Sequence, residues 1–360
     1  MQKDFHYYAT YSAARLAGYT HEDAMQICYA DQMVDCCTRT MLRRVGGPMD
    51  AATTQLQLEL ADARTDIIGL QDITRIWASF HFLPYDLKAE PKKKCTRRYL
   101  RKYRLLCDVN GNLVVDTVNL AKGSSLQAAG LAMHVLADTW AHRYFAGTPS
   151  LVLNNPSRFY DLDQDKEIKF THNPKSSDDL DEGKYTNCIY QSGERSIMNL
   201  GHGRAGHIPD YSFIRYSFMP SWADYEILTK DNPEEYYKAF TQMICALKFL
   251  RGETDEFRKD TYDEAAAEPY REVIMAILRE RQADASAHWK RFGENLSRRE
   301  IEDFDEFKYD EEYKSAPEDS KNETVLGKFF LAATKQKSMV SESIFQSGSK
   351  LAGIGGKRER

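Results

Sequence analysis

The most apolar segment of the chain reads SSLQAAGLAMHVLADTWAHRYF over residues 124–145. Its apolar residues recur at spacings of three and four, which predicts a helix whose buried face includes Leu126, Leu131 and Val135. Because this is the most apolar of the helices that the sequence predicts, we expect it to lie at the centre of the fold.

Three polar side chains interrupt this apolar helix, His134, Asp138 and His142. They stand at positions i, i+4 and i+8, so each is turned only about 40° from the last and all three share one face. A buried carboxylate between two imidazoles is costly unless a cation lies on the same face, and a divalent metal ion meets that need. The alternative is a metal-free network in which the two histidines hydrogen-bond to Asp138.

The length of this stripe bears on the number of metal ions. At about 1.5 Å rise per residue, His134 and His142 lie roughly 12 Å apart along the helix axis. Zinc–nitrogen bonds are about 2 Å long, so a single ion cannot reach both histidines. The spacing therefore implies more than one ion, with Asp138 as a bridging ligand.

Periodicity elsewhere also predicts mainly helix. Thr20 and Asp23 have the spacing of an N-capping box. The further predicted helices cover residues 5–17, 20–35, 56–80, 233–251 and 265–294. We expect a mainly α fold, a multi-helix bundle.

Two segments depart from this helical pattern. Residues 105–118 predict a small β-hairpin insertion, because β-favouring runs flank Asn110 and Gly111. Residues 146–220 are rich in Gly, Pro, Asn and Asp, which indicates a long irregular connection of the kind that carries function.

The chain has 360 residues, of which 42% are hydrophobic, a size that suits one large domain or two. We expect residues 1–300 to form a single helical, metal-binding catalytic domain, which includes the basic segment and hairpin of residues 88–118 and the ligand-bearing region 146–220. Residues 301–360 then form an acidic linker and a C-terminal tail. That tail has a short apolar helix near Phe329, for which a packed terminal helix and a peripheral membrane contact both fit.

Charge and cysteine content limit the possible partners and the location. A net charge of −5 argues against nonspecific nucleic-acid binding. However, residues 88–104 hold nine Lys or Arg residues against Glu90 alone, interleaved with Tyr99 and Tyr103. This segment is either a solvated loop or a contact for phosphates or anionic lipid headgroups. Seven cysteines without a CxxC pair and the lack of a signal-peptide core predict a cytoplasmic protein, or one delivered out of the cell without a cleavable signal.

A multinuclear site needs ligands from other segments, and six residues qualify. Some lie at the ends of predicted helices and the others lie in a glycine-containing loop, where the backbone can approach an ion closely. The candidates are His6, Asp35, His81, His202, His207 and Asp210. Each is weak alone, since a capping or surface role would explain it, but together they supply suitable nitrogen and oxygen ligands.

The HxxxDxxxH helix resembles the central motif of the zinc-dependent phospholipase C superfamily, to which the single-strand-specific zinc nucleases are structurally related. The chain is more closely similar to an uncharacterised bacterial and fungal family with the same blocks in the same order. These blocks span residues 4–220 and include His6-Tyr-Tyr-Ala-Thr-Tyr, Val34-Asp35, His81-Phe-Leu-Pro84, Gly201-His202-Gly-Arg204 and Pro209-Asp210. The resemblance implies a helical protein with a three-zinc cluster.

The resemblance also implies how the ligands are shared. One ion is held by Asp35, His81, His134 and Asp138, a second by His6 with Asp138, and a third by His142 and Asp210 with His202 or His207. The phospholipases use the amino group of an N-terminal tryptophan as a ligand, whereas this chain begins Met1-Gln-Lys. We therefore expect the first site to be built differently, and a cluster of two zinc ions rather than three is an alternative.

Two or three zinc ions favour hydrolysis of phosphate esters, including phospholipids. By analogy with the phospholipases, Asp35 is the candidate to orient or deprotonate the attacking water. Arg204 and Arg143 are the candidates to pair with the phosphate. Two alternatives remain open, a metal-stabilised interaction protein without turnover and a delivered toxin or effector that uses the same site.

Overall fold

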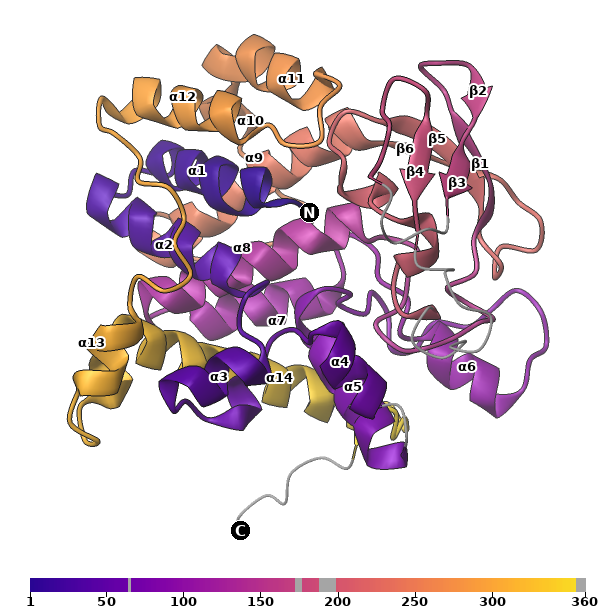
Figure 1. Ribbon diagram of the computed structural model, residues 1–360, viewed down its shortest axis with the longest axis horizontal. Helices are drawn as coiled ribbons and strands as arrows, with labels where there is room; N and C mark the ends of the chain where they lie inside the picture. Colours follow the sequence, from indigo (N-terminus) through magenta and orange to yellow (C-terminus); the bar gives the residue numbers. More distant parts are fainter. Residues whose placement is uncertain (64–65, 172–176, 188–198, 354–360) are drawn as a thin grey trace.

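A computed structural model describes residues 1–63, 66–171, 177–187 and 199–353 of the chain. Helices make up most of it, and a small sheet lies at one side (Figure 1). The predicted mainly α fold class is therefore confirmed. Among the described residues, no helix has both the length and the apolarity needed to cross a membrane.

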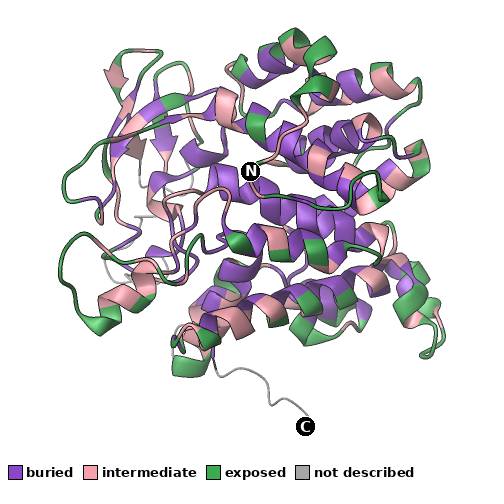
Figure 2. Cartoon of the chain, turned by 180° about the vertical axis from the view of Figure 1, so that it is seen from behind, coloured by how far each residue is buried: buried purple, intermediate pink, exposed green. Residues whose placement is uncertain are grey.

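Helix α8 (Leu126–Ala141) lies at the centre, as the sequence predicts. Ser125 caps it by accepting a hydrogen bond from the amide of Ala128, and every residue from Gln127 to Ala141 is buried. Helices α2 (His21–Met33), α7 (Asn112–Ala121), α9 (Asn232–Arg251) and α14 (Val325–Gln346) pack around it. Figure 2 shows this buried centre from behind, with exposed residues confined to the outer helices and loops.

The N-terminal segment forms the π-helix η1 (Asp4–Ala9), which continues into α1 (Thr10–Leu16). Thr20 caps α2 by accepting a hydrogen bond from the amide of Asp23, which confirms the predicted cap. Two short elements, α3 (Arg39–Val45) and η2 (Met49–Ala51), follow.

Two long predicted helices are in fact divided. Residues 56–80 form α4 (Gln57–Ala63) and α5 (Ile67–Phe80), because Asp66 caps a new helix through the amide of Gly69. The segment 265–294 likewise contains α10 (Glu264–Ala267), η6 (Glu268–Tyr270), α11 (Arg271–Arg279) and the start of α12 (Ser286–Ser297).

The predicted β-hairpin at residues 105–118 is wrong. Gly111 begins α7, and only isolated bridges, from Leu106 to Ala146 and from Cys107 to Pro84, involve the residues before it. The β-branched residues that suggested strands instead bury Val114 and Val118 on one face of α7, four residues apart. Tertiary packing here overrides the local β preference. Upstream, the basic segment contains the short helix α6 (Arg97–Tyr103).

Residues 146–220 are less irregular than expected. Strands β1 (Ser157–Asp161), β2 (Lys166–Glu167), β5 (Arg215–Met219) and β6 (Leu228–Asp231) form an antiparallel sheet in the order β2-β1-β5-β6. A parallel pair, β3 (Lys169–Thr171) and β4 (Lys184–Thr186), forms a second sheet beside this one, with Phe170 of β3 against Phe159 of β1. Two 3-10 turns follow, η4 (Gly203–Ala205) and η5 (Ile208–Asp210). Alternate residues of β5, Tyr216 and Phe218, pack with Phe145 and Phe159 in a second aromatic core.

The segment expected to be a linker and tail contributes to the main core instead. It contains α13 (Asp310–Ser315), η7 (Lys321–Glu323) and α14. Phe329, Val340 and Ile344 of α14 are buried in the same hydrophobic cluster as α8. Of the two structures considered for this helix, the packed terminal helix is the one observed.

Candidate metal centre

The polar stripe of α8 faces α2 because the two helices approach closely at Gly130. A Cβ atom at Gly130 would lie 2.1 Å from the carbonyl oxygen of Ile27, so a larger side chain would push the helices apart. One turn further along α8, His134 Nδ1 lies 3.2 Å from Asp31 Oδ1 of α2. The small residue therefore sets the spacing at which the two helices share polar side chains.

Asp138 is the hub of the site. One of its oxygens, Oδ1, lies 3.2 Å from His6 Nε2, and the other, Oδ2, lies 3.1 Å from His81 Nδ1 and 3.2 Å from His134 Nε2. The side chain is 1% exposed. A single buried carboxylate therefore contacts residues from η1, α5 and α8.

Three groups of side chains place their ligand atoms within 4.8 Å of one another and could each hold a metal ion. They are His6 with Asp31 and His134, Asp35 with His81 and His134, and His142 with His202 and Asp210. His134 belongs to two groups, and the structure thus brings most of the predicted ligands into one continuous cluster.

Four of these imidazoles have one ring nitrogen anchored and the other directed into the cluster. His81 Nε2 donates to the carbonyl of Thr53, and His142 Nδ1 donates to the carbonyl of His81. His202 Nδ1 donates to the carbonyl of Gly206, and His134 Nδ1 bonds with Asp31. Because a histidine that binds a metal through one nitrogen usually donates from the other, this arrangement fits metal ligation.

His6 provides an independent sign of a missing partner. Its ring is fully buried and stacks on that of His134, with ring centroids 3.9 Å apart. Its two nitrogens lie 2.8 Å from Asp31 and 3.2 Å from Asp138, yet neither is aligned for a hydrogen bond with a described residue. Buried polar atoms rarely lack such bonds, so His6 fits a metal ligand. The π-helical turn that carries it is a form frequent at functional sites.

The far end of the cluster is built by η4 and η5. Asp210 Oδ1 lies 3.0 Å from His142 Nε2, and Asp210 Oδ2 lies 3.6 Å from His202 Nε2. Gly201 has a φ of +52°, and a Cβ atom there would lie 2.1 Å from the ring of Phe82, so glycine allows this close turn. His207 is different: its side chain is 59% exposed and lies 3.8 Å from Asp210. Of the two alternatives, the structure brings His202 into the group.

The amino nitrogen of Met1 also lies in the cluster, contrary to expectation. It is 2.8 Å from Asp138 Oδ1, 3.4 Å from Asp210 Oδ1 and 3.3 Å from His142 Nε2. The amide of His6 donates to the carbonyl of Gln2, and this helical turn returns Met1 to the carboxylate that His6 contacts. The Met1 nitrogen therefore lies between Asp138, Asp210 and His142, a position that the sequence assigned to no residue.

Asp31 is a site residue that the sequence analysis did not select. Its Oδ1 contacts His6 Nδ1 and His134 Nδ1, and its Oδ2 accepts a hydrogen bond of 2.6 Å from Thr10 Oγ1. The sequence spacing could have indicated Asp31, because it lies four residues before Asp35, and residues four apart lie on the same side of a helix.

The cluster gathers acidic and basic groups whose pKa values depend on one another. Asp31, Asp35, Asp138 and Asp210 bring four carboxylates into the cluster. Burial acts to raise the pKa of Asp138, but His142, the Met1 amino group and His134 outweigh it and hold that pKa well below its usual range. Burial likewise acts to raise the pKa of Asp210, which His202 and the Met1 amino group lower well below its usual range. Both carboxylates are thus ionised in the interior, where a bound cation stabilises them.

Neighbouring histidines respond in opposite directions to the same carboxylates. Burial acts to lower the pKa of His134, but Asp138 and Asp35 raise it to about 10. For His81, burial prevails and the pKa is lowered. His134 Nε2 and His81 Nδ1 are 3.3 Å apart, so two protons on these facing nitrogens would repel one another. His81 and His134 could instead hold a divalent ion, which would supply positive charge in place of a proton.

The three residues proposed for catalysis lie in different settings. Asp35 lies 3.8 Å from His134 Nε2 and 3.9 Å from His81 Nδ1, and its side chain is 33% exposed. Arg204 is next but one to His202 and hydrogen-bonds to Asn155. Arg143 instead pairs with Asp108 and Glu235, each at 3.0 Å. The structure thus places Asp35 inside the cluster and Arg204 beside it, and it engages Arg143 elsewhere.

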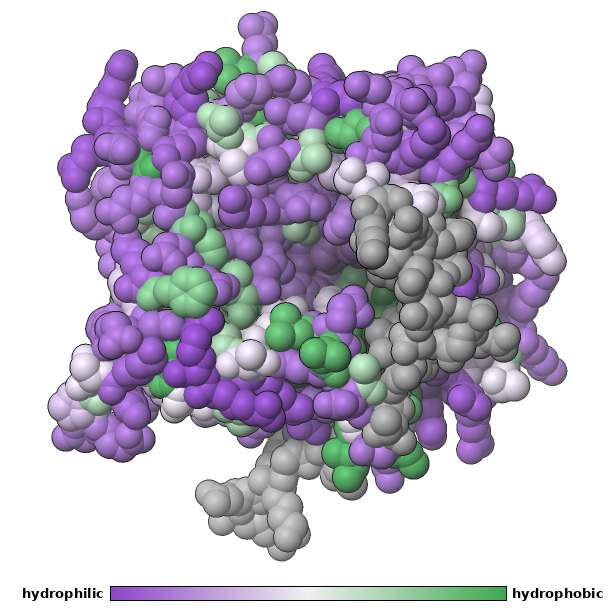
Figure 3. All heavy atoms as spheres, in the orientation of Figure 1, coloured by the Kyte–Doolittle hydropathy of each residue, from purple (hydrophilic) through white to green (hydrophobic). Residues whose placement is uncertain are grey.

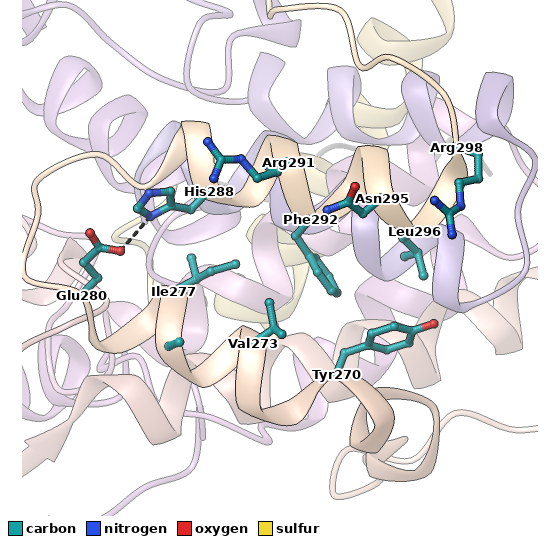
Figure 4. Close-up of a pocket in the computed structure, with 11 residues that line it drawn as sticks. Tyr270, Val273, Ile277, Glu280, His288, Arg291, Phe292, Asn295, Leu296 and Arg298 are labelled. Carbon is teal, nitrogen blue, oxygen red and sulfur yellow. Dashed lines mark ion pairs between the residues drawn. The ribbon is translucent and has the colours of Figure 1, made fainter.

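The surface is hollowed near the centre of the face that Figure 3 shows, next to the place where Figure 1 marks the N-terminus. A separate groove between α11 and α12 is lined by Val273, Ile277 and Phe292, with His288 and Glu280 paired at 2.8 Å (Figure 4). None of the residues that line this groove belongs to the cluster, so the groove is not part of the metal centre.

Comparison with known proteins assigns the chain to a protein family. A protein-family model, described as "Family of unknown function (DUF6765)", matches residues 1–344. Comparisons with curated proteins and with solved structures find no match.

Proposed function

The chain belongs to this family, DUF6765, and from its own residues we propose that it is a zinc-dependent hydrolase of phosphate esters, a phosphodiesterase similar to the phospholipases C. The observation that carries this proposal is the set of anchored imidazoles around Asp138. Mixed imidazole and carboxylate ligands suit zinc. Bound zinc ions supply an activated water and neutralise charge on a phosphoryl group, and a multinuclear site does both better than a single ion.

The ligands divide along the cluster. Asp35, His81 and His134 would hold one ion, and His142, His202 and Asp210 another. Asp138 lies between the two groups, with His6 and the Met1 amino nitrogen beside its Oδ1. These nitrogens favour a third position, so the proposal is for two or three ions.

Asp35 is the residue proposed to act on the attacking water. It is the cluster carboxylate most open to solvent, with 33% exposure against 9% or less for Asp31, Asp138 and Asp210. A water molecule at the mouth of the cluster would therefore meet this carboxylate, which would orient it and accept its proton. Asp31 is a positioning residue, because it holds the Nδ1 atoms of His6 and His134 while their Nε2 atoms face Asp138.

The anion-binding role falls to Arg204 rather than to Arg143. Two carboxylates already neutralise Arg143, whereas among the described residues the Arg204 guanidinium donates to the neutral amide of Asn155 and pairs with no carboxylate. A guanidinium that keeps its charge available can pair with a phosphate through two parallel hydrogen bonds.

The test compares wild type with Asp35→Asn and with a control at an exposed carboxylate, Asp319→Asn. Zinc is measured by plasma mass spectrometry and turnover with bis(p-nitrophenyl) phosphate. We expect Asp35→Asn to retain zinc and to lose 100-fold or more of the activity, as roughly expected for a general base, and Asp319→Asn to behave like wild type. Equal activity in Asp35→Asn and wild type would contradict the assigned role.

The other two functions predict different results. A metal-stabilised interaction protein would contain zinc and unfold on chelation, but would turn over none of a panel of phosphodiesters. A delivered effector would be toxic when expressed in a target compartment, and His134→Ala would abolish that toxicity. Phosphodiesterase activity in purified protein that is harmless on expression supports the proposal over both.

A further inference from the structure

Helices α4 and α5 expose large apolar side chains beside the metal centre. Leu58 is 80% exposed, Ile67 75% and Ile68 78%. Figure 3 shows strongly apolar atoms over α4, below the hollow, and over the lower end of α5, at the bottom of the molecule. Three aliphatic side chains this exposed in neighbouring elements exceed what scattered surface residues explain, and such patches mark interaction sites.

The exposed helices are continuous with the metal centre. The residue after the end of α5 is His81, whose Nδ1 faces Asp138. Before α4, the carbonyl of Thr53 accepts the hydrogen bond that anchors His81, and the side chain of Gln55 accepts one from Trp77 of α5. Leu58 thus lies in a segment that adjoins the cluster, whereas Ile67 and Ile68 lie at the opposite end of α5 from His81, about 20 Å away along the helix.

A basic surface lies on α6 and on the residues just before it. Lys94, Arg97, Arg98 and Arg101 are exposed, and no ion pair joins them to a carboxylate of the described residues. The preceding lysines of the same segment are neutralised, since Lys92 pairs with Glu226 and Lys93 with Asp224. Four unpaired positive charges therefore remain on one short stretch.

One loop joins the apolar and basic surfaces. Lys102 of α6 donates to the carbonyl of Pro149, and Thr148 Oγ1 lies 2.9 Å from Thr74 Oγ1 of α5. The same loop exposes Leu151 by 49% and Val152 by 50%. The loop thus connects α5 with α6 and adds two exposed apolar side chains between them.

We propose that this edge, made of the apolar residues Leu58, Ile67, Ile68, Leu151 and Val152 and the basic residues Lys94, Arg97, Arg98 and Arg101, docks on an anionic phospholipid membrane. The charges complement anionic headgroups, and the aliphatic side chains reach the acyl-chain boundary. The inference rests on the proposed function, because a docked phospholipid membrane would supply phosphate esters of the kind on which the proposed hydrolase acts.

The test is sedimentation of the full chain with vesicles, which requires no turnover. We compare vesicles of phosphatidylcholine with vesicles of equimolar phosphatidylcholine and phosphatidylserine. We expect wild type to bind the mixed vesicles at least tenfold more tightly. Two variants address the edge, Ile67→Ser with Ile68→Ser, and a triple change to Gln at Arg97, Arg98 and Arg101. Each is expected to lose at least tenfold in binding to the mixed vesicles.

Matched controls remove equivalent groups elsewhere. Val273→Ser removes an exposed aliphatic residue, and a triple change to Gln at Lys238, Arg291 and Lys335 removes three exposed charges that have no described ion pair. Both controls should bind like wild type. Equal binding of wild type to the two kinds of vesicle, no binding to either, or wild-type binding by both edge variants would overturn the proposal.

The failure of this proposal is distinguishable from that of the proposed function. If the edge variants lose vesicle binding but wild type hydrolyses no phosphodiester, the docking surface stands and the hydrolase assignment fails. If the edge variants bind vesicles normally and wild type hydrolyses bis(p-nitrophenyl) phosphate, the reverse holds.

Discussion

Helix α8 buries polar side chains, whereas the neighbouring helices α4 and α5 expose apolar ones. His134 and Asp138 are at most 1% exposed, and Leu58 and Ile68 are at least 78% exposed. Each region reverses the usual distribution of polar and apolar residues, and each reversal is costly unless something outside the chain compensates. We propose that a metal ion is the compensating partner for α8 and that a lipid surface is the one for α4 and α5. Departures from the normal pattern thus locate the functional parts of the fold.

The largest effect is expected for Asp138→Ala. Removing this carboxylate leaves the Met1 amino group and His134 buried without their main counter-charge, which costs about 3–5 kcal/mol in free energy of unfolding. Bound metal should be lost as well. Chemical denaturation and metal analysis measure both effects, and Asp116→Ala on the exposed side of α7 is the control. A stable, metal-loaded Asp138→Ala protein would show that Asp138 is needed neither as a counter-charge nor for metal binding.

A smaller effect is expected for Asp31→Asn. The amide keeps the size of the side chain but removes the negative charge that lies 3.2 Å from His134 Nδ1 and 2.8 Å from His6 Nδ1, so zinc affinity should fall about 10- to 100-fold. Titration against a competing chelator measures this. Thr10→Val, which removes the hydrogen bond to Asp31 Oδ2, should reduce the affinity less. If Asp31→Asn binds zinc as tightly as wild type, Asp31 neither positions the histidines nor binds the metal.

Lys337 of α14 is a buried ionisable side chain outside the cluster, and it predicts a dependence of stability on pH. Burial lowers its pKa from 10.5 to about 8, and its Nζ lies 3.3 Å from the carbonyl of Ala52. Between pH 8 and 10.5 the unfolded chain therefore binds more protons, and the stability of the wild type rises with pH through this window.

Lys337→Met should remove that rise and stabilise the protein by about 1–2 kcal/mol at pH 7, after allowing for the lost hydrogen bond. Chemical denaturation at several pH values measures it, with exposed Lys335→Met as the control. If Lys337→Met is destabilised and its stability depends on pH as in wild type, burial does not disfavour the ammonium charge of Lys337 in the native protein.

The smallest effect on folding is expected at the exposed apolar residues. Ile67→Ser with Ile68→Ser should change the free energy of unfolding by less than about 0.5 kcal/mol per residue, because neither side chain is buried. Thermal melting checks this. A large loss of stability would mean that these side chains pack in the folded chain, and the contrast with α8 would then disappear.

Local spacing made much of the site predictable. His134, Asp138 and His142 are four residues apart on one helix, so their shared face follows from helix geometry alone. The same holds for the cap at Thr20, because its partner Asp23 is three residues away. Such features depend on a single element and need no knowledge of packing.

Features that depend on tertiary structure were missed. Residues 112–121 carry β-branched side chains that suit either a strand or the buried face of a helix. Packing against the surrounding helices favours the helix α7. Asp31 becomes a site residue only because Gly130 lets α2 approach α8. The place of the Met1 amino nitrogen depends on the turn through Gln2. In each case the deciding contact is made by a distant element or a backbone turn.

Metal content per chain is the decisive measurement for the proposed zinc centre. It is made by plasma mass spectrometry on wild type and His134→Ala, both purified without a metal-affinity step. We predict two or three zinc ions per wild-type chain. His134→Ala should contain less zinc, because His134 contributes to two of the three ligand groups. A folded wild type that contains no metal and does not gain stability on addition of zinc would contradict the account. His134, Asp138 and His142 would then form a buried polar network.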